Sequence, residues 1–417
     1  GRRRGASAAR PRRRGAGGRS DVFRQQRSGA RRTETIVGGM VRDAVRATLH
    51  ENINYEPIEV DIATSAKPDE IKRFFSEYTL IEVGEAFGVL IVRSPEGIDY
   101  EVATYRSESD YDGRRPGSVI HVGDLTDDVM RRDFTVNGLA VGLEGNVIDH
   151  VGGIEDLKNH YVRAIGDADL RFREDFLRML RAVRFTALLK GTLDESAQTA
   201  IRRHANDLQK ISAERIRDEL LRMLTLRNSS DAIKLLDDLG LLEVILPELA
   251  RCKGAPQPEN FHPEGDVYTH TLLALEQADL FMNDARVKLA LLLHDIGKPL
   301  ALEENDGVNA AGHDAIGAEL SRKICKRLRF SSGDANFISS LVAEHQRIGH
   351  FPSMNRAKQV RFIKAHENEA HTVVQFSERY YWFKCLLQLM VADCQASAMK
   401  SKGWLSVIRV VRPLLLY

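Results

Sequence analysis

Two glycines stand directly before a stretch typical of a helix, and an acidic pair follows roughly twenty residues later. The glycines are Gly38 and Gly39, and the acids are Glu59 and Asp61 in a β-like run. Glycine lets the backbone approach a triphosphate closely, and a helix N-terminus offers unpaired N–H groups to the phosphates. Because side chains alternate along a strand, Glu59 and Asp61 share one face and can hold Mg²⁺ together. The arrangement predicts a nucleotide site, although Gly-Gly alone is equally typical of a tight turn.

Further polar side chains downstream suit the same chemistry. Glu101, at the start of EVATYR, can add a third carboxylate from a neighbouring strand. Metal ions held by such carboxylates can activate a 3′-hydroxyl and stabilise the leaving pyrophosphate. In RRDFTVNG, Arg132 can bind phosphate, while Asp133 and Asn137 can read ribose hydroxyls. A solvated acid at a strand edge is the alternative for Glu101.

The segment REDFLRMLRAVRF places Asp175, Arg178 and Arg181 at three-residue steps, which predicts that they share roughly one face of a helix. An aspartate accepts hydrogen bonds and an arginine donates them. Together they can match the edge of a base without a template strand. The alternative is a solvated helix face with salt bridges, which is the commoner origin of such spacing.

A second set of metal-binding residue types lies in the C-terminal part. His270 follows a predicted helix start, His294-Asp295 ends an apolar helix in LLLHDIGKP, and Asp393 lies in LMVADC. Imidazole and carboxylate together suit a divalent transition metal. His313 and His345 can support a second metal, although a surface or core histidine is the favoured interpretation of each.

The predicted secondary structure that carries these residues changes along the chain, from strands in the first part to helices in the rest. Of 417 residues, 43% are hydrophobic, as in a globular protein of two to four domains. Residues 1–32 hold twelve arginines and one acid, which predicts a basic, disordered leader, and the remainder carries a net charge of about −10. Strands are expected at Ile58–Ile62, Val89–Arg93, Ile98–Arg106 and Asn146–His150. We therefore predict an α+β domain over residues 33–165, helices over 166–252, a linker at Lys253–Asn260, and a second all-α domain over 261–417 that is incomplete at its end.

Several ordered motifs resemble those of class II tRNA nucleotidyltransferases, a family that includes bacterial poly(A) polymerases. They are GGMVRD, the acid-x-acid of EVDIATSAKP, GEAFGVL, YRSESDYDGRRP, RRDFTVNG, EDFLRMLR and SAERIRDEL. The resemblance implies a polymerase-β-like head, a helical neck and Mg²⁺ on Glu59 and Asp61. It implies contacts of Gly39, Arg42 and Arg132 with the triphosphate or sugar, and base selection by Asp175 and Arg178 with Arg181 and Arg184 nearby. The family's first metal-binding acid is usually Asp rather than Glu59.

The C-terminal motifs resemble the HD superfamily of metal-dependent phosphohydrolases. His270, His294, Asp295 and Asp393 match its His…His-Asp…Asp order, which implies a second divalent metal, of a transition element. A nucleotidyltransferase followed by an HD domain is similar to some bacterial CCA-adding enzymes.

Three functions follow as hypotheses. The first is template-independent addition of CCA to the tRNA acceptor end from CTP and ATP, and the loop near Asp110–Pro116 favours addition of the final A. The second is a poly(A) polymerase or an A-adding enzyme. The third is an HD phosphohydrolase for RNA repair with a non-catalytic, RNA-binding head. No run approaches the roughly 18 apolar residues of a membrane span. The four cysteines lack C-x-x-C spacing, so the cytoplasm is the expected compartment. The sequence does not indicate an oligomeric state.

Overall fold

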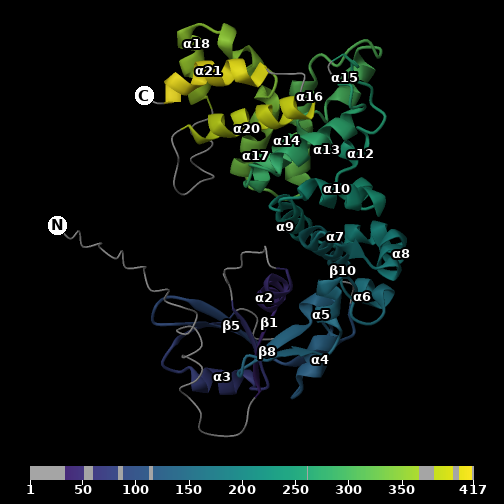
Figure 1. Cartoon of the computed structure of the whole chain (residues 1–417), viewed down its shortest axis with the longest axis vertical. Coiled ribbons are helices and arrows are strands. Elements are labelled where there is room, and N and C mark those ends of the chain that lie inside the picture. The colour runs from purple at the N-terminus through teal and green to yellow at the C-terminus, as the bar shows by residue number, and fades with distance from the viewer. Residues whose placement is uncertain are drawn as a thin grey trace, which may run out of the picture.

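The computed structural model describes residues 33–50, 60–82, 88–111, 116–260, 262–365, 380–397 and 403–415. These residues form an arc (Figure 1), with a sheet-containing head at one end, a column of helices rising from it, and a helical lobe at the other end. Within the described ranges, every helix falls short of the length and apolarity that crossing a bilayer requires.

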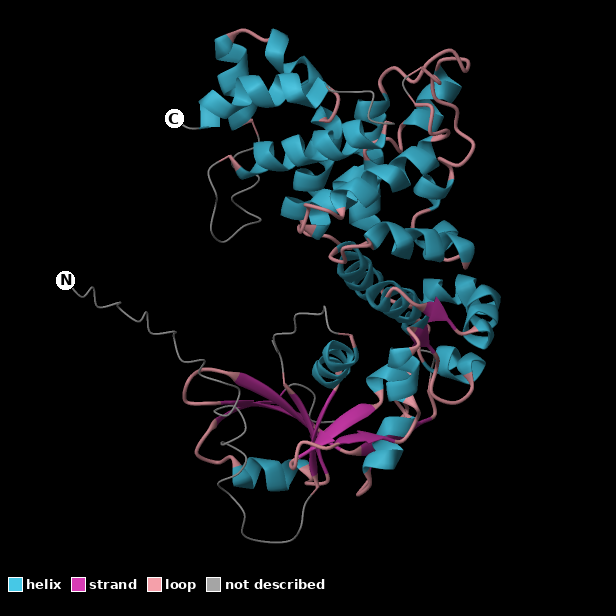
Figure 2. Ribbon diagram, viewed as in Figure 1, coloured by secondary structure: helices cyan, strands magenta, loops and turns pink. Residues whose placement is uncertain are grey.

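The head is built on a seven-stranded sheet of order β3-β4-β5-β2-β1-β8-β9, whose twist is visible in Figure 2. Its strands are β1 (Glu34–Val37), β2 (Asp61–Thr64), β3 (Thr79–Glu82), β4 (Val89–Arg93), β5 (Asp99–Thr104), β8 (Leu139–Gly142) and β9 (Val147–Asp149). Strands β2 and β5 pair in parallel, whereas β1 pairs antiparallel with both β2 and β8. A separate hairpin joins β6 (Arg106–Ser109) to β7 (Ser118–His121).

Apolar side chains on both faces of this sheet pack against helices. On one face Ile62 and its neighbours contact Ile71 of α3 (Pro68–Phe74), and on the other Val37 and its neighbours contact Val129 of α4 (Leu125–Met130). The remaining head helices are α2 (Gly39–Leu49), the 3-10 helix η2 (Thr135–Asn137) and α5 (Gly153–Lys158). Asp61 is the first residue of β2, so it lies at the end of this strand, beside α2.

The sequence-predicted strands match the structure closely. Val89–Arg93 is β4 at the predicted bounds, Ile98–Arg106 contains β5, and Asn146–His150 contains β9. The predicted strand Ile58–Ile62 overlaps β2 only from residue 61, and its first two residues lie outside the described ranges. The α+β prediction for the head is confirmed.

The neck, which runs from α6 to α12, and the C-terminal lobe, which runs from α13 to α21, are helical apart from the short strand β11 (Thr192–Leu193). This strand of the neck pairs in parallel with β10 (Tyr161–Val162), which precedes α6. The neck helices are α6 (Ala168–Glu174), α7 (Leu177–Leu189), α8 (Glu195–His204), α9 (Ala213–Leu224), α10 (Ser229–Asp238), α11 (Leu242–Ile245) and α12 (Pro247–Ala250). The lobe contains α13 (Val267–Ala278), α14 (Ala285–Leu293), α15 (Lys298–Glu304), α16 (His313–Arg327), α17 (Ser332–Glu344), α18 (Arg356–Lys364), α20 (Tyr381–Ala396) and α21 (Gly403–Leu415).

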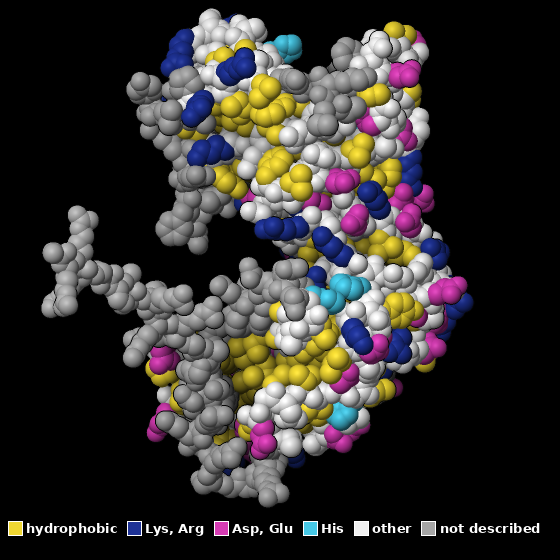
Figure 3. Space-filling model, viewed as in Figure 1, with side chains coloured by type: hydrophobic (Ala, Val, Ile, Leu, Met, Phe, Trp, Pro, Cys, Tyr) yellow, Lys and Arg dark blue, Asp and Glu magenta, His cyan; other side chains and the backbone are white. Residues whose placement is uncertain are grey.

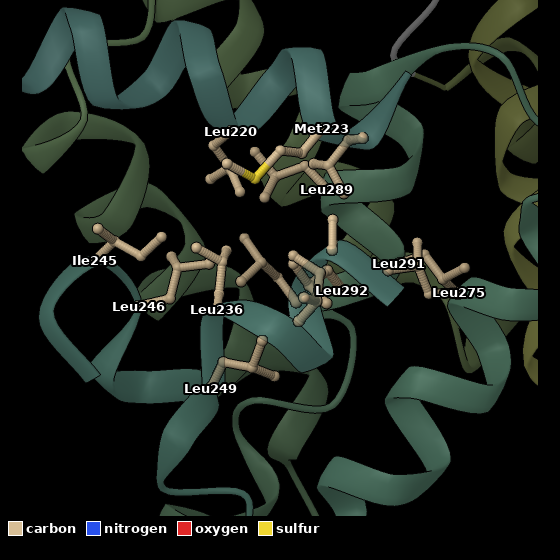
Figure 4. Close-up of a cluster of buried hydrophobic side chains, with 14 of the residues drawn as sticks. Leu220, Met223, Leu236, Ile245, Leu246, Leu249, Leu275, Leu289, Leu291 and Leu292 are labelled. Carbon is tan, nitrogen blue, oxygen red and sulfur yellow. The ribbon is translucent and has the colours of Figure 1, made fainter. Parts of the chain in front are cut away.

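Neck and lobe share one hydrophobic core. Figure 4 shows Leu220 and Met223 of α9 near Leu236 of α10 and Leu289 and Leu292 of α14, and all five side chains are fully or almost fully buried. Burying one such side chain contributes roughly 1.5–3 kcal/mol. The two helical parts are therefore held together by the same packing that stabilises each of them.

A buried ion pair reinforces this junction. Lys288 of α14 lies 2.6 Å from Asp279 and donates a second hydrogen bond, of 2.7 Å, to the carbonyl of Leu226. Asp279 also accepts hydrogen bonds from the Ser229 hydroxyl and the Ser230 N–H of α10. The charges are compensated, so the pair fixes α10 against α14.

Candidate functional site

The turn between β1 and α2 brings the backbone against a carboxylate. Gly38 lies between the end of β1 and the start of α2 with φ +82° and ψ −156°, a conformation that is essentially confined to glycine. A Cβ atom at Gly38 would lie 2.5 Å from Oδ2 of Asp61. Gly38 is therefore required both by its backbone angles and by the close approach of Asp61.

Asp61 and Glu101 lie side by side. They are Cα partners in the parallel pair of β2 and β5, so both side chains leave the sheet on the same face. The two carboxylates lie next to Gly38, which has no side chain to fill the space beside them. Such a pair of carboxylates suits a hard divalent cation. The predicted partner Glu59 lies outside the described residues, so its pairing with Asp61 stays a prediction.

Both carboxylates open into a pocket of about 890 Å³ between head and neck. The predicted residues that line it are Gly38, Gly39, Arg42, Asp61, Glu101, Arg132, Asp133, Asn137, Asp175, Arg178, Arg181 and Arg184. The described part of the predicted nucleotide site is thus gathered into one cavity, although its residues span more than a hundred positions of the sequence.

Arg42, in the first turn of α2, connects the glycine turn to the segment RRDFTVNG. Its guanidinium donates a 2.9 Å hydrogen bond to Oδ1 of Asn137, pairs with Asp43 at 2.7 Å, and lies 5.0 Å from the centre of the Phe185 ring. Asn137 in turn donates to Asp133 at 3.0 Å. These contacts hold the Arg42 side chain, which is 7% exposed, in one orientation at the pocket wall.

Asp133 joins the head to the neck. Nε and Nη2 of Arg181 lie 2.7 and 2.6 Å from its Oδ2. Burial alone would raise the pKa of Asp133, but the charge of Arg181 and the hydrogen bond from Asn137 outweigh it and lower the pKa to about 2. Arg181 and Arg184 both lie near Glu219 of α9, at 3.8 and 2.6 Å. In this structure Asp133 therefore holds the side chains of Arg181 and Asn137 in place at the pocket.

Arg132 is placed by a buried acid. Asp128 of α4, 1% exposed, binds Arg132 at 2.9 Å and Arg131 at 2.6 Å. Burial would raise the pKa of Asp128, but the two guanidinium groups lower it below its usual range. The hairpin β6–β7 lies beside this group, because Arg131 also lies 3.2 Å from Glu108. Residues 112–115 of the predicted loop lie outside the described ranges.

The expectation that Asp175, Arg178 and Arg181 share a helix face is wrong for Asp175. Asp175 has an extended backbone between α6 and α7, and its Oδ1 accepts the N–H of Leu177 at the start of α7. A short polar side chain is preferred at this position because it accepts a hydrogen bond from a free N–H at the helix start. Only Arg178 and Arg181 lie within α7.

The side chains of Asp175 and Arg178 are held by different partners. Asp175 binds Arg215 of α9 through two hydrogen bonds of 3.1 and 2.6 Å. Arg178 pairs with Glu174 and donates to the carbonyls of Arg171 and Arg131, each at 3.1 Å. Both side chains line the pocket, and each is held by its own partner.

Sequence reasoning missed several residues that shape this pocket. They are Asp128, Phe185, Arg215 and Glu219, each of which contacts a predicted site residue. Arg215 and Glu219 lie four residues apart in SAERIRDEL, on the side of α9 that faces the pocket. The available signal was the spacing alone, because four residues place two side chains on the same face of a helix.

A second cluster of polar side chains lies in the C-terminal lobe. Two sets have potential ligand atoms within 4.8 Å of one another: His270, His294 and Asp393, and Asp295, His313 and His345. They come from α13, α20 and the ends of α14, α16 and α17. All four predicted residues of the HD pattern are therefore brought together. His313 and His345, for which a surface or core position was favoured, also lie beside Asp295, at 3.3 and 3.7 Å.

Three of these histidines are oriented in the same way. Their Nδ1 atoms lie 2.6–2.7 Å from backbone carbonyls, those of Leu291 for His294, Ala310 for His313 and Val342 for His345. Each Nδ1 must carry a proton to donate to a carbonyl, so in the neutral ring each Nε2 presents a lone pair to the Asp295 carboxylate. Nε2 of His294 is buried without a hydrogen bond. Lone pairs facing a carboxylate in a buried site fit a divalent cation between them.

The charges of this cluster agree with that interpretation. Burial would raise the pKa of Asp393, but hydrogen bonding to His270 and the nearby His294 lower it to about 2. Lys298 lies 2.6 Å from Asp295. Both carboxylates are thus ionised and available as ligands at neutral pH.

Family comparisons match three successive parts of the chain. Residues 35–163 match the poly A polymerase head domain, residues 192–253 match the probable RNA and SrmB-binding site of polymerase A, and residues 267–368 match the HD domain. A CCA-adding enzyme of Lactobacillus gasseri is 47% identical over 211 residues, which is 50% of this chain and 50% of that protein. That of Lactobacillus helveticus is 44% identical over 216 residues, 52% and 51% of the two chains. The chain thus spans about half the length of the curated relatives it matches.

Solved structures resemble the chain over a longer range. The Bacillus stearothermophilus CCA-adding enzyme in complex with CTP has a TM-score of 0.62 and 25% identity, covering 92% of this chain and 88% of that one. The Thermotoga maritima CCA-adding enzyme complexed with tRNA has a TM-score of 0.52 and 16% identity, covering 92% of each, which shows the fold alone. The predicted resemblance and the predicted fold class, a nucleotidyltransferase head followed by helical parts, are confirmed.

Proposed function

The chain carries a poly A polymerase head domain and an HD domain, and from that premise we propose that it adds CCA to the 3′ end of tRNA from CTP and ATP. The observation that carries this proposal is the placement of Asp61 beside Glu101, over the glycine turn, in a pocket lined by arginines. The solved relative that contains CTP supports CTP as a substrate.

In this proposal each part of the pocket has a separate role. Gly38 and Gly39 admit the triphosphate to the N-terminus of α2, where free N–H groups and the helix dipole favour an anion. Arg132, held by Asp128, binds the phosphates. Arg42 contacts the sugar or phosphate while Asn137 fixes its orientation.

Asp61 and Glu101 would hold Mg²⁺, with Glu59 as the predicted further ligand. When bound, Mg²⁺ lowers the pKa of the attacking 3′-hydroxyl and stabilises charge on the leaving pyrophosphate. The protein residues orient the α-phosphate for in-line attack by the RNA terminus, which is a matter of positioning rather than covalent catalysis.

Base selection belongs to Asp175 and Arg178. Arg215 holds the Asp175 carboxylate, and Glu174 holds Arg178, so an acceptor and a donor are presented to the pocket in fixed positions. Fixed polar groups discriminate strongly, because a base that fails to match leaves them unpaired. Such a pair can select a nucleotide without a template strand.

The tRNA acceptor end is the proposed RNA substrate. The CCA-adding relative that was solved with tRNA supports this choice. Figure 3 shows a hollow between head and lobe, with Lys and Arg side chains at the inner side of the arc where the neck meets both. Because the chain outside residues 1–32 has a net charge of about −10, a local basic surface is what an RNA would require. The four cysteines are free thiols, which suits the reducing cytoplasm.

Product sequencing separates CCA addition from synthesis of long A tracts. The full chain is incubated with tRNA that lacks its 3′ end, together with CTP and ATP, and the products are sequenced. Ends that stop at CCA are expected. Long A tracts would support a poly(A) polymerase, and addition of A alone to tRNA ending in CC would support an A-adding enzyme.

A second function is favoured by the histidine cluster of the lobe. We propose that His270, His294, Asp295 and Asp393 hold a divalent transition metal, that His313 and His345 support a second one with Asp295, and that the site hydrolyses phosphate esters. When bound, the metal supplies a nucleophilic water at neutral pH. Water adds to phosphorus and the bond from phosphorus to one ribose oxygen breaks, so 2′,3′-cAMP is expected to open to 2′- or 3′-AMP, and His294→Ala is expected to abolish this reaction. Ring opening that persists in this variant would contradict the assignment.

A further inference from the structure

A short segment before α13 reaches the histidine cluster from outside the HD pattern. Glu264 lies in it, and its side chain is 5% exposed. Oε1 of Glu264 lies 2.7 Å from Nδ1 of His270 and 2.9 Å from Nδ1 of His262. The other nitrogen of His270, Nε2, lies 2.9 Å from Oδ1 of Asp393. His270 thus stands between two carboxylates, one on each side of its ring.

His270 needs a partner that the other histidines of the cluster do not need. His294, His313 and His345 stand at helix ends, where a nearby backbone carbonyl accepts from Nδ1. His270 lies within α13, where carbonyls serve the helix itself; that of Val267 also accepts the Thr271 hydroxyl. An acceptor from outside the helix is required to fix its ring, and Glu264 supplies one.

We propose that Glu264 is a positioning residue for the metal centre of the lobe. An ionised carboxylate only accepts hydrogen bonds, so it fixes the proton of His270 on Nδ1 and leaves Nε2 as a metal ligand. The negative charge also makes Nε2 more basic. Oε2 of Glu264 is buried without a hydrogen bond, a costly arrangement. The inference rests on the metal site proposed above.

One competing arrangement uses the same atoms. His262, Glu264 and His270 lie close enough to hold a cation among themselves. That cation would use the lone pair of Nδ1 of His270, which places the one proton of the neutral ring on Nε2, towards Asp393. Nε2 could then not bind the metal of the HD residues, so the two arrangements exclude each other, and the His262 variant below distinguishes them.

Co²⁺ binding tests the proposal by calorimetry on the full chain, with millimolar Mg²⁺ present to occupy the head. Glu264→Ala is expected to weaken Co²⁺ binding by roughly 10–100-fold, the usual effect of losing such a partner. Glu264→Gln is expected to recover part of this loss, because its amide oxygen still accepts from Nδ1. His262→Ala serves as the matched control and is expected to stay within about threefold of wild type, because it leaves the Glu264–His270 contact in place.

Two results would overturn the positioning role. One is wild-type affinity in Glu264→Ala. The other is equal weakening in His262→Ala and Glu264→Ala, which would indicate a cation held by the three residues themselves. If the wild type bound no Co²⁺, or bound it with an affinity that His294→Ala left unchanged, the metal centre itself would be refuted, and the positioning role with it. CTP incorporation, measured on the same preparations, reports the head separately and is expected to be unchanged in all of these variants.

Discussion

Replacement of Gly38 by alanine tests whether the glycine turn serves Asp61. The new Cβ would lie 2.5 Å from Oδ2 of Asp61, whereas ordinary contact begins at 3.4 Å, so the carboxylate must move by about 0.9 Å. A displacement of this size in a catalytic group costs on the order of 10²-fold in rate, equivalent to about 2.7 kcal/mol in the activation barrier. The backbone angles add strain of roughly 1–3 kcal/mol, which lowers stability.

A second glycine separates the two effects. Gly145, in the turn between β8 and β9, has φ +84° and nothing within 4 Å of its would-be Cβ. Gly145→Ala therefore also carries a penalty for positive φ but leaves Asp61 undisturbed. Both variants are expected to unfold at a lower temperature than wild type.

The assay is CTP incorporation into tRNA that lacks its 3′ end, at a temperature where circular dichroism shows both variants folded. Gly38→Ala is expected to be about 10²-fold slower than Gly145→Ala under saturating CTP. Rates within about threefold of each other would show that the Asp61 carboxylate tolerates the added methyl group, and the glycine turn would then not be needed for its position.

Three further predictions concern the charged pairs. Arg215→Met frees Asp175 from its ion pair, so misincorporation of UTP is expected to rise by roughly tenfold, the value of about one hydrogen bond, as measured by competition with CTP. Lys288→Met leaves the charge of Asp279 buried and is expected to destabilise the protein by about 3–5 kcal/mol, whereas also replacing Asp279 by leucine should restore most of the thermal midpoint. Asp133 has a pKa of about 2 in the folded protein against an ordinary 3.8, so it contributes about 2 kcal/mol of stability above pH 4. This contribution is lost as the pH falls from about 4 towards 2, and Asp133→Asn should show a correspondingly weaker acid destabilisation.

Local patterns in the sequence predicted much of the fold. The β-branched run of β4 and the glycine pair before α2 depend on neighbouring residues alone, and both were found. The parallel pairing of β2 with β5 could not be predicted, because β3 and β4 intervene in the chain and pair at the sheet edge. The adjacency of Asp61 and Glu101 was therefore a hypothesis that only the tertiary structure could test.

Contacts between distant residues account for what sequence reasoning missed at the sites. Arg215 pairs with Asp175 across 40 residues, and His270 meets Asp393 across 123. His270 and Asp393 were found because both belong to the same ordered motif. No motif assigned a role to the pairing of Arg215 with Asp175. Asp175 was assigned to a helix face from spacing alone, but its side chain caps the helix start instead.

We propose that Asp61 serves nucleotide addition in a site separate from the histidine cluster. The most direct measurement compares Asp61→Ala and His294→Ala for CTP incorporation and for hydrolysis of 2′,3′-cAMP to AMP. Asp61→Ala is expected to abolish incorporation and to leave hydrolysis intact, with the reverse for His294→Ala. A folded Asp61→Ala variant that still incorporates CTP, or that loses both activities, would contradict this proposal.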